Sequence, residues 1–244
     1  MNKICTICAR AGSKGVKNKN VRQLLGKPLI AHTILQAKSA GIFNAIAVSS
    51  DSEEILEISK QWGVDYLVMR PSKLASDNAA KIPAIQHCVQ EVELLTGMYF
   101  DTIVDLDATS PLRDVSDIIG AVHLLEETSV SNVITGTPAH RSPYFNLVEL
   151  DNNGVACLSK SLKQPVVRRQ DAPICYDMNA SIYVWNRSAF FQSNTIFNPD
   201  TLLFEMPQAR SIDIDSELDF EMVEFLMSTK QGKQKTLKRN IRVI

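Results

Sequence analysis

The 244-residue sequence contains no apolar run of the roughly 20 residues that a membrane-spanning helix needs. Its net charge is only −1 at pH 7, which gives no reason to expect nucleic acid or an anionic membrane as a partner. The amino terminus runs directly into a predicted strand and lacks the apolar segment and cleavage site of a signal peptide. We therefore expect a cytoplasmic protein that binds neither nucleic acid nor membrane.

Cysteine is also scarce. The 5 cysteines are odd in number and irregularly spaced, so they predict no disulfide framework. Cys5 and Cys8 form a C-x-x-C pair, but an offset of three residues in a strand places two side chains on opposite faces. We therefore interpret both as structural residues in a reducing compartment.

What the first half does contain is a regular alternation of apolar strands and amphipathic helices. The strands are predicted at residues 4–9, 45–48, 65–68, 102–106 and 132–135, with helices beginning near residues 28, 51, 82 and 116. The alternation predicts an α/β fold with a mostly parallel sheet and helices on both faces. Ligands of such sheets bind beyond the carboxyl ends of the strands, so the loops after Ala9, Ser50 and Leu106 should meet.

The second half breaks this rhythm. Turn signals cluster in residues 138–178 and predict an inserted β-rich lobe, so the core should comprise residues 1–137 and 179–229. A strand at 181–185 should return the chain to the core, and a last helix should cover 216–227. The tail at 230–244 is basic without an acidic residue, and we interpret it as solvated or packed on a partner subunit rather than as a nucleic-acid patch.

Residues 9–20, A-R-A-G-S-K-G-V-K-N-K-N, follow the first strand at the expected binding edge. Glycines there allow a tight turn and close backbone approach to a ligand, and the exposed amides form an anion-binding concavity. The spacing matches neither the P-loop nor the dinucleotide fingerprint, which argues against a P-loop kinase and a dehydrogenase. The alternative is a flexible cationic loop. Its cations are Arg10, Lys14, Lys17 and Lys19.

Residues 212–215, I-D-I-D, alternate strictly. In a strand, Asp213 and Asp215 would share one face while the isoleucines face the core. Two carboxylates on one edge suit Mg²⁺, which takes one or two carboxylates together with phosphates. The alternative is that Asp215 caps the following helix and Asp213 is solvated.

The loop at 9–20, followed by G-K-P-L-I at 26–30, resembles the A-R-x-G-S-K-G-x-x-x-K-N signature of the acylneuraminate cytidylyltransferases, the CMP-sialic acid synthetases. Further similarities follow in chain order over residues 10–225. They are V-S-S-D at 48–51, R-P at 70–71 with L-A-S-D at 74–77, T-S-P-L-R at 109–113, and the acidic motif at 212–219.

This resemblance implies a Rossmann-like nucleotide-diphospho-sugar transferase fold whose small inserted lobe serves dimerisation, and hence a homodimer. It implies that CMP passes from CTP to the anomeric hydroxyl of a nonulosonic, sialic-acid-like sugar, with Mg²⁺ as cofactor and release of pyrophosphate. The rival interpretations are a 3-deoxy-octulosonate cytidylyltransferase and a non-catalytic nucleotide-binding module on the same fold.

The resemblance also implies triphosphate contacts from Arg10, Ser13 and Lys19, and places Arg70 near the cytosine nucleotide. The CTP-binding residues that we predict are Arg10, Gly12, Ser13, Lys14, Lys19, Asn20, Arg70 and Asp77. The predicted catalytic residues are Lys19, Asp213 and Asp215, of which the two aspartates are the metal ligands. The predicted sugar-binding residues are Asp107, Thr109, Ser110, Arg113, Arg169, Gln170 and Asn179.

Two departures from the family pattern concern the sugar half. Asp107 stands where the family often has glutamine, and an acid cannot donate the same hydrogen bonds, so it would join the metal site or read a different substituent. Asp105 shares its strand face, and its role is open. Ala180 replaces the more usual glycine, and Arg168 or Arg169 is either a partner for the sugar carboxylate or a surface pair. These departures resemble the branch that acts on legionaminic-acid-type sugars.

Overall fold

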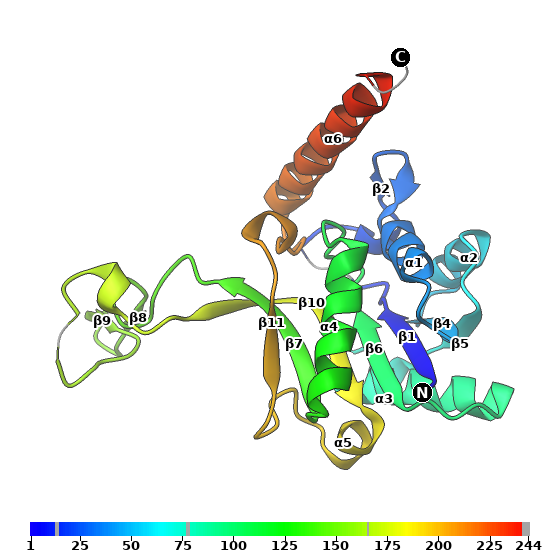
Figure 1. Ribbon diagram of the computed structural model, residues 1–244, viewed down its shortest axis with the longest axis horizontal. Helices are drawn as coiled ribbons and strands as arrows, with labels where there is room; N and C mark the ends of the chain where they lie inside the picture. The colour runs from blue at the N-terminus through cyan, green and yellow to red at the C-terminus, as the bar shows by residue number, and fades with distance from the viewer. Residues whose placement is uncertain (13–14, 77–78, 165, 241–244) are drawn as a thin grey trace.

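The structure is a computed structural model that describes residues 1–12, 15–76, 79–164 and 166–240, the side chains of 231–240 excepted. Its core is a seven-stranded sheet (Figure 1). In spatial order the strands are β11 (Leu202–Glu205), β7 (Asn132–Pro138), β10 (Tyr176–Asn186), β6 (Thr102–Leu106), β1 (Lys3–Cys8), β4 (Ala45–Ser50) and β5 (Tyr66–Met69). Only β10 runs antiparallel to its neighbours, so the predicted, mostly parallel sheet is confirmed.

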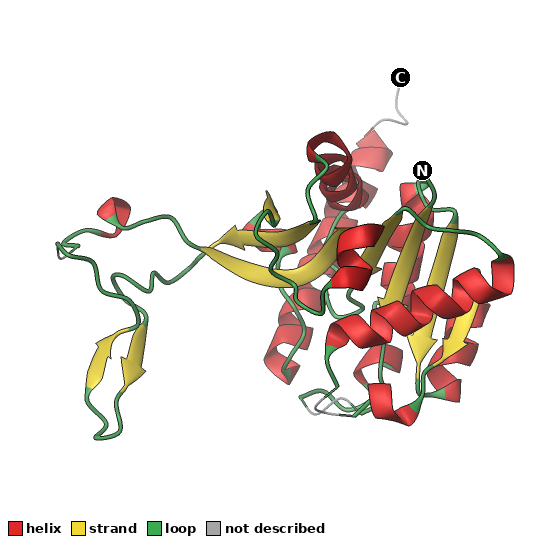
Figure 2. Ribbon diagram, turned by 90° about the horizontal axis from the view of Figure 1, so that it is seen from below, coloured by secondary structure: helices red, strands yellow, loops and turns green. Residues whose placement is uncertain are grey.

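Helices cover both faces of the sheet, as predicted (Figure 2). One face packs against α1 (Leu29–Ala40), α2 (Glu53–Gln61) and α4 (Val115–Thr128), and the other against α3 (Lys81–Thr96) and α5 (Arg187–Gln192). Cys5 belongs to the apolar core on the first of these faces, and Cys8 packs against the apolar core on the other. This confirms that the two side chains point to opposite faces of the sheet. Burial on both faces explains why the central strands are apolar throughout.

Several elements carry no strong sequence signal and were not predicted. They are the edge strand β11, the short helix α5 and a small hairpin of β2 (Gln23–Leu24) and β3 (Lys27–Pro28). The starts of α2 and of the last helix carry side-chain caps. The Ser52 hydroxyl accepts a bond from the Ile55 amide at 3.3 Å, and Ser216 and Asp219 cap each other, with 2.8 Å from the Ser216 amide to the Asp219 carboxylate.

Residues 138–178 project from the sheet where β7 and β10 extend beyond their neighbours (Figures 1 and 2). This lobe holds less β structure than expected: a hairpin of β8 (Val148–Leu150) and β9 (Ala156–Leu158), a 3₁₀ turn at Arg169–Asp171, and connecting loops. Both hairpin strands are exposed along their whole length.

The last helix, α6 (Glu217–Asn240), extends away from the sheet (Figure 1). The expected break between a helix ending at residue 227 and a separate tail is wrong. The lysines, glutamines and leucine of the following segment are good helix formers, so the helix propagates through it. None of the helices in the described ranges combines the length and apolarity needed to cross a membrane.

Candidate active site

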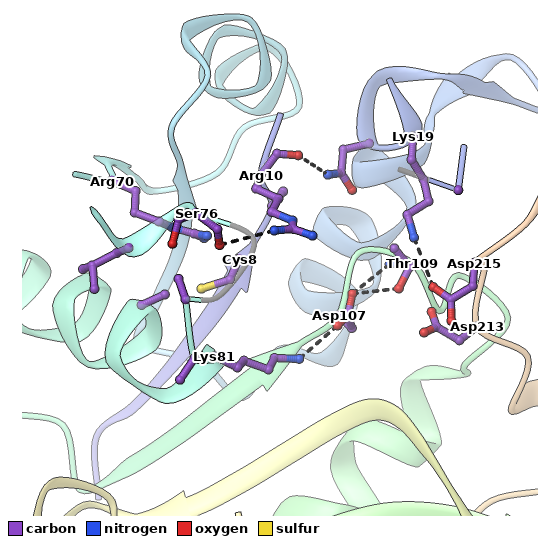
Figure 3. Close-up of a pocket in the computed structure, with 17 residues that line it drawn as sticks. Cys8, Arg10, Lys19, Arg70, Ser76, Lys81, Asp107, Thr109, Asp213 and Asp215 are labelled. Atoms are coloured by element: carbon purple, nitrogen blue, oxygen red, sulfur yellow. Dashed lines mark hydrogen bonds and ion pairs between the residues drawn. The ribbon is translucent and has the colours of Figure 1, made fainter. Parts of the chain in front are cut away.

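A cavity of about 440 Å³ lies beyond the carboxyl ends of β1, β5 and β6 (Figure 3). The loops that follow these strands meet there, and the Ala11 amide donates to the Asp51 carboxylate after β4 at 3.0 Å, so the predicted convergence of loops is confirmed. Its charged lining residues are Arg10, Lys19, Arg70, Lys81, Asp107, Asp213 and Asp215.

The cationic loop contributes Arg10, Gly15, Lys19 and Asn20 to the cavity wall. The Lys19 ammonium donates to the Ile214 carbonyl and lies 3.5 Å from the Asp215 carboxylate. The Asn20 amide nitrogen donates to the Arg10 carbonyl at 3.0 Å, while its buried oxygen has no hydrogen-bond partner among the described residues. That oxygen is therefore an acceptor available to a ligand.

Arg70 comes from the other side of the cavity, directly after β5. It is buried, and its guanidinium donates to the Ser49 hydroxyl at 3.1 Å and to the Ser49 carbonyl at 2.7 Å. The predicted residues Ser13, Lys14 and Asp77 lie outside the described residues.

The two loop glycines differ in a way that the sequence did not show. A Cβ on Gly15 would lie 1.8 Å from the Asp215 carbonyl oxygen, so this position requires glycine because two segments of the protein's own chain touch there. Gly12 is exposed, has nothing within 4 Å of such a Cβ, and is absent from the cavity lining. At Gly15 the loop therefore approaches the acidic motif closely.

The acidic motif is not a strand. Residues 211–215 are irregular, held by a 3.0 Å bond from the Ile214 amide to the Thr109 carbonyl. Its alternation nevertheless sorts the side chains as predicted, because Ile214 is fully buried in an apolar cluster while Asp213 and Asp215 both line the cavity. The alternation at 212–215 therefore reflects which side chains are buried, and not pairing in a sheet.

Burial raises the pKa of Asp213, and the neighbouring Asp107 carboxylate adds to this rise. Among the described residues there is no group of three or more histidine, cysteine and acidic side chains that would bind a metal alone. A hard cation bound by Asp213 and Asp215 would take its remaining oxygen ligands from phosphates and water.

Lys81, the first residue of α3, is a cavity residue that the sequence analysis missed. Its ammonium lies 2.9 Å from the Asp107 carboxylate and 3.1 Å from that of Asp105. Burial alone would raise the pKa of Asp107, but Lys81 and the hydrogen bonds from Thr109 outweigh it and lower the pKa to about 2. An isolated lysine at a helix start gives no sequence signal for such a contact.

Arg113, predicted to bind the sugar, is buried behind the cavity wall and is not one of the residues that line it. Its guanidinium donates to the Thr33 hydroxyl at 2.8 Å, to the Gln36 amide oxygen at 3.0 Å and to the carbonyls of Asp107 and Ser181. Burial lowers its pKa to about 10, which still leaves it protonated near neutrality. These hydrogen bonds all go to other groups of the protein, so Arg113 fixes the loop that carries Asp107.

Ser110 is likewise fully buried, with its hydroxyl 3.4 Å from the Asp213 carboxylate. Thr109, in contrast, lines the cavity, and its amide and hydroxyl donate to one Asp107 oxygen at 3.1 and 2.8 Å. Of the predicted residues in this loop, Asp107 and Thr109 face the cavity, and Ser110 and Arg113 support them from behind.

A second hollow of about 330 Å³ lies on the other side of the acidic motif, so that Asp213 and Asp215 line both hollows. Asn179 lines this second hollow, where its amide nitrogen donates to the Ser211 hydroxyl at 3.0 Å. The next residue, Ala180, has φ of 51° at a break in the pairing of β10 with β7. This left-handed backbone explains why glycine is the more usual residue there.

Arg169 and Gln170 lie in the projecting lobe and line a separate hollow together with Arg141. Arg169 donates to the Ala139 carbonyl at 2.9 Å, and Arg168 pairs with Asp171 at 2.9 Å. Within one chain, the fold does not bring Arg169 and Gln170 to the main cavity.

The sequence matches the cytidylyltransferase family over residues 4–238. It is 45% identical to the CMP-N,N'-diacetyllegionaminic acid synthase of Campylobacter jejuni, over 93% of this chain and 95% of that protein. It is also 45% identical to the post-translational flagellin modification protein B of Campylobacter coli, over 95% and 97% of the two chains.

The N-acylneuraminate cytidylyltransferase of Escherichia coli is 30% identical, over 98% of this chain and 55% of that protein. Among solved structures, a CMP:2-keto-3-deoxy-manno-octonic acid synthetase complexed with CTP superposes with a TM-score of 0.69, at 16% identity, covering 94% of this chain and 100% of that one. That likeness establishes the shared fold. The family match over nearly the whole length, together with the cavity at the carboxyl ends of the strands, shows that this chain belongs to the cytidylyltransferase family.

Proposed function

We propose that the protein transfers CMP from CTP to the anomeric hydroxyl of a nonulosonic acid and releases pyrophosphate. The observation that carries this proposal is one cavity in which the cationic loop touches the acidic motif, through Lys19 and Gly15 on one side and Asp215 on the other. A cavity that merely bound a nucleotide would have no need of that junction between phosphate-binding and metal-binding groups.

The nucleotide half comprises the cationic loop and the segments opposite it. Arg10 and Lys19 supply charge-assisted bonds to phosphate oxygens, and Asn20 offers its buried oxygen to a ligand hydroxyl. Arg70 lines the other side of the cavity, where it would lie near the cytosine nucleotide. Ser13, Lys14, Gly12 and Asp77 complete the proposed CTP-binding set on the strength of the sequence motif.

The proposed cofactor is Mg²⁺, held by Asp213 and Asp215. Two carboxylates beside a phosphate-binding loop are the donor set that this ion prefers. When bound, it would neutralise phosphate charge and make the attacking hydroxyl more acidic. If Asp215→Asn kept full Mg²⁺-dependent turnover, this ligand assignment would be wrong.

In the reaction, the anomeric oxygen of the sugar forms a bond to the α-phosphorus of CTP. The bond from the α-phosphorus to the oxygen that bridges to the β-phosphate breaks, pyrophosphate leaves, and the hydroxyl proton passes to solvent. Positioning and charge neutralisation do most of the work in such displacements. The Lys19 ammonium, which contacts the Ile214 carbonyl and the Asp215 carboxylate, would stabilise negative charge at the reacting phosphate.

The sugar half involves Asp107 and Thr109 in the main cavity and Asn179 in the adjoining hollow, with the acidic motif between them. Ser110 and Arg113 contribute by holding this wall in place. The acceptor that we propose is of the diacetamido, legionaminic-acid type, supported by the 45% identity to the Campylobacter jejuni synthase.

We further propose that residues 138–178 form a dimerisation lobe on a core of residues 1–137 and 179–229. Exposed apolar side chains on the lobe, such as Leu150 at 69%, support an interface between two copies. Arg169 and Gln170 would then contact the sugar bound to a partner subunit. The five free cysteines agree with a cytoplasmic location.

The decisive experiment is a measurement of pyrophosphate release from CTP and Mg²⁺ with a panel of acceptors. The panel comprises N,N'-diacetyllegionaminic acid, pseudaminic acid, N-acetylneuraminic acid and 3-deoxy-manno-octulosonic acid. We expect release with at least one nonulosonic acid. Release with 3-deoxy-manno-octulosonic acid alone would reassign the substrate, and tight CTP binding without release would indicate a nucleotide-binding module.

A further inference from the structure

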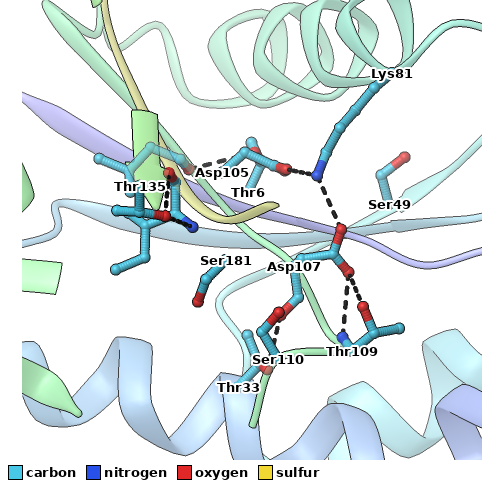
Figure 4. A network of polar contacts seen from close by, with 12 residues as sticks. Thr6, Thr33, Ser49, Lys81, Asp105, Asp107, Thr109, Ser110, Thr135 and Ser181 are labelled. Atoms are coloured by element: carbon cyan, nitrogen blue, oxygen red, sulfur yellow. Dashed lines mark hydrogen bonds and ion pairs between the residues drawn. The ribbon is translucent and has the colours of Figure 1, made fainter. Parts of the chain in front are cut away.

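Beneath the sugar half of the cavity, Lys81 sits between two carboxylates on the same face of the sheet (Figure 4). Asp105 has no exposed surface, and its other oxygen accepts a bond from the Thr6 hydroxyl at 2.8 Å. The Lys81 ammonium also lies 4.4 Å from the centre of the Tyr183 ring. A lysine held on three sides in this way has little freedom to move.

The bonds to Asp107 can be counted. One carboxylate oxygen accepts from the Thr109 amide and the Thr109 hydroxyl, and the other accepts from Lys81. An ionised carboxylate offers about four acceptor positions, so about one has no partner among the described residues. Asp107 lines the cavity, and this remaining position is the one left for a ligand.

The main chain of Asp107 is fixed as well. Arg113 donates to its carbonyl from behind, and its amide donates to the Ser181 carbonyl at 3.1 Å. The Asp107 carboxylate therefore has a fixed orientation as well as a fixed negative charge. With Lys81 on one oxygen and Thr109 on the other, Asp107 is poorly placed to act as a ligand of the metal.

The position of Asp107 assigns it to the sugar rather than to the nucleoside. It is bonded to Thr109, whose carbonyl accepts the Ile214 amide between the two acidic residues of the proposed metal site. Arg70, the residue expected near the nucleoside, lies across the cavity from the acidic motif (Figure 3). A ligand group that reaches Asp107 is therefore close to the reacting phosphate, where the sugar must bind.

We propose that Lys81 is a positioning residue for acceptor recognition, which holds the Asp107 carboxylate so that it accepts one hydrogen bond from an N–H or O–H group of the sugar. This inference rests on the proposed function. A glutamine, the more usual residue here, would both donate and accept, whereas the ionised Asp107 carboxylate accepts only. An acceptor sugar that presents no donor at this point leaves a charged group unpaired and is rejected.

The test separates the KM of the sugar from the KM of CTP. Lys81→Met alone would leave Asp105 buried without its cation, so the main variant is Lys81→Met with Asp105→Asn. We expect the KM of the sugar to rise about 10- to 100-fold, the factor for losing one hydrogen bond to a charged group, with the KM of CTP within about twofold. Lys81→Arg, which keeps the positive charge beside Asp107, should raise the KM of the sugar less than the double variant does.

The matched control is Lys3→Met, which removes a lysine ion pair of 2.9 Å with Glu126 at the amino-terminal end of β1. It should change neither KM. A rise in the KM of CTP in the Lys81 variant, or an unchanged KM of the sugar, would overturn the inference. If the unaltered protein turns over none of the acceptors, the proposed function itself has failed, which is a separate result.

Discussion

Asp107 in the cavity wall and Arg169 in the lobe are both predicted to contact the sugar, yet the structure holds them differently. The Asp107 side chain is bonded by Lys81 and Thr109, and its carbonyl is held by Arg113. Arg169 is exposed and donates to a single carbonyl, that of Ala139. The wall around Asp107 is preorganised by several bonds within the chain, whereas Arg169 in the lobe is exposed and lies outside the main cavity. Variants of the cavity wall should therefore change stability or kcat, whereas variants of the lobe should change assembly.

The largest effect is expected from Arg113→Met in the wall. The change leaves the carbonyls of Asp107 and Ser181 buried without their charged donor, and should lower the free energy of unfolding by about 3 kcal/mol. Urea unfolding of the variant and the parent protein measures this difference. Equal stability would show that the wall is not held as described.

Gly15→Ala tests the junction between the cationic loop and the acidic motif. The added Cβ would meet the Asp215 carbonyl at 1.8 Å, so the two segments must separate, and kcat should fall about 100-fold. Lys3→Met, which lies outside the cavity, is the control and should leave kcat unchanged. An unchanged kcat in Gly15→Ala would argue against the junction.

The pH dependence of stability tests the bonding of Asp107. Its folded pKa, lowered to about 2, lies below the unfolded value of about 3.9. The stabilisation is therefore present above about pH 4 and is lost as the pH falls through 2, by about 2.5 kcal/mol in total. Unfolding of Asp107→Asn across this range should show a correspondingly flatter dependence. The same slope in both proteins would contradict the ion pair with Lys81.

Ala180→Gly should stabilise the protein by about 1 kcal/mol, because the backbone at this position is left-handed, with φ of 51°. The gain should appear as a higher midpoint in thermal unfolding. Gly97→Ala, at φ of 68°, is the reciprocal control and should lower the midpoint. A loss of stability in Ala180→Gly would mean that the Ala180 methyl group contributes contacts that outweigh the strain.

Leu150→Glu in the lobe should have the smallest effect on unfolding of a single chain, within about 0.5 kcal/mol, because Leu150 is 69% exposed. Its effect should appear in assembly instead, as a shift from dimer to monomer in sedimentation, together with a higher KM for the sugar. An unchanged dimer would remove this surface from the proposed interface.

The contrast between wall and lobe also marks what the sequence could predict. The alternation of strands and helices predicted the fold and the edge of the sheet where the loops meet. The loop around Arg10 and Lys19 could be recognised from its own residues. Both predictions succeeded because local patterns encode these features. Lys81 and Arg113 were missed or misassigned because their partners are distant in sequence: 26 positions separate Lys81 from Asp107 and 68 separate Arg113 from Ser181. No local pattern encodes such contacts.

The acidic motif shows a subtler limit. Its alternation correctly predicted which side chains face the cavity, but the strand was wrong. Among the described residues, one backbone bond to Thr109 holds the segment where a sheet ladder was expected. Periodicity reports burial, and more than one backbone arrangement can produce the same burial.

The most direct test of the whole account is ³¹P NMR of the protein with CTP, Mg²⁺ and N,N'-diacetyllegionaminic acid. A single cavity that joins the phosphate loop to the acidic motif predicts equal amounts of a CMP-sugar phosphodiester and pyrophosphate, both abolished in Asp213→Asn. Unchanged CTP in the presence of every nonulosonic acid, or pyrophosphate formed without the phosphodiester, would contradict it.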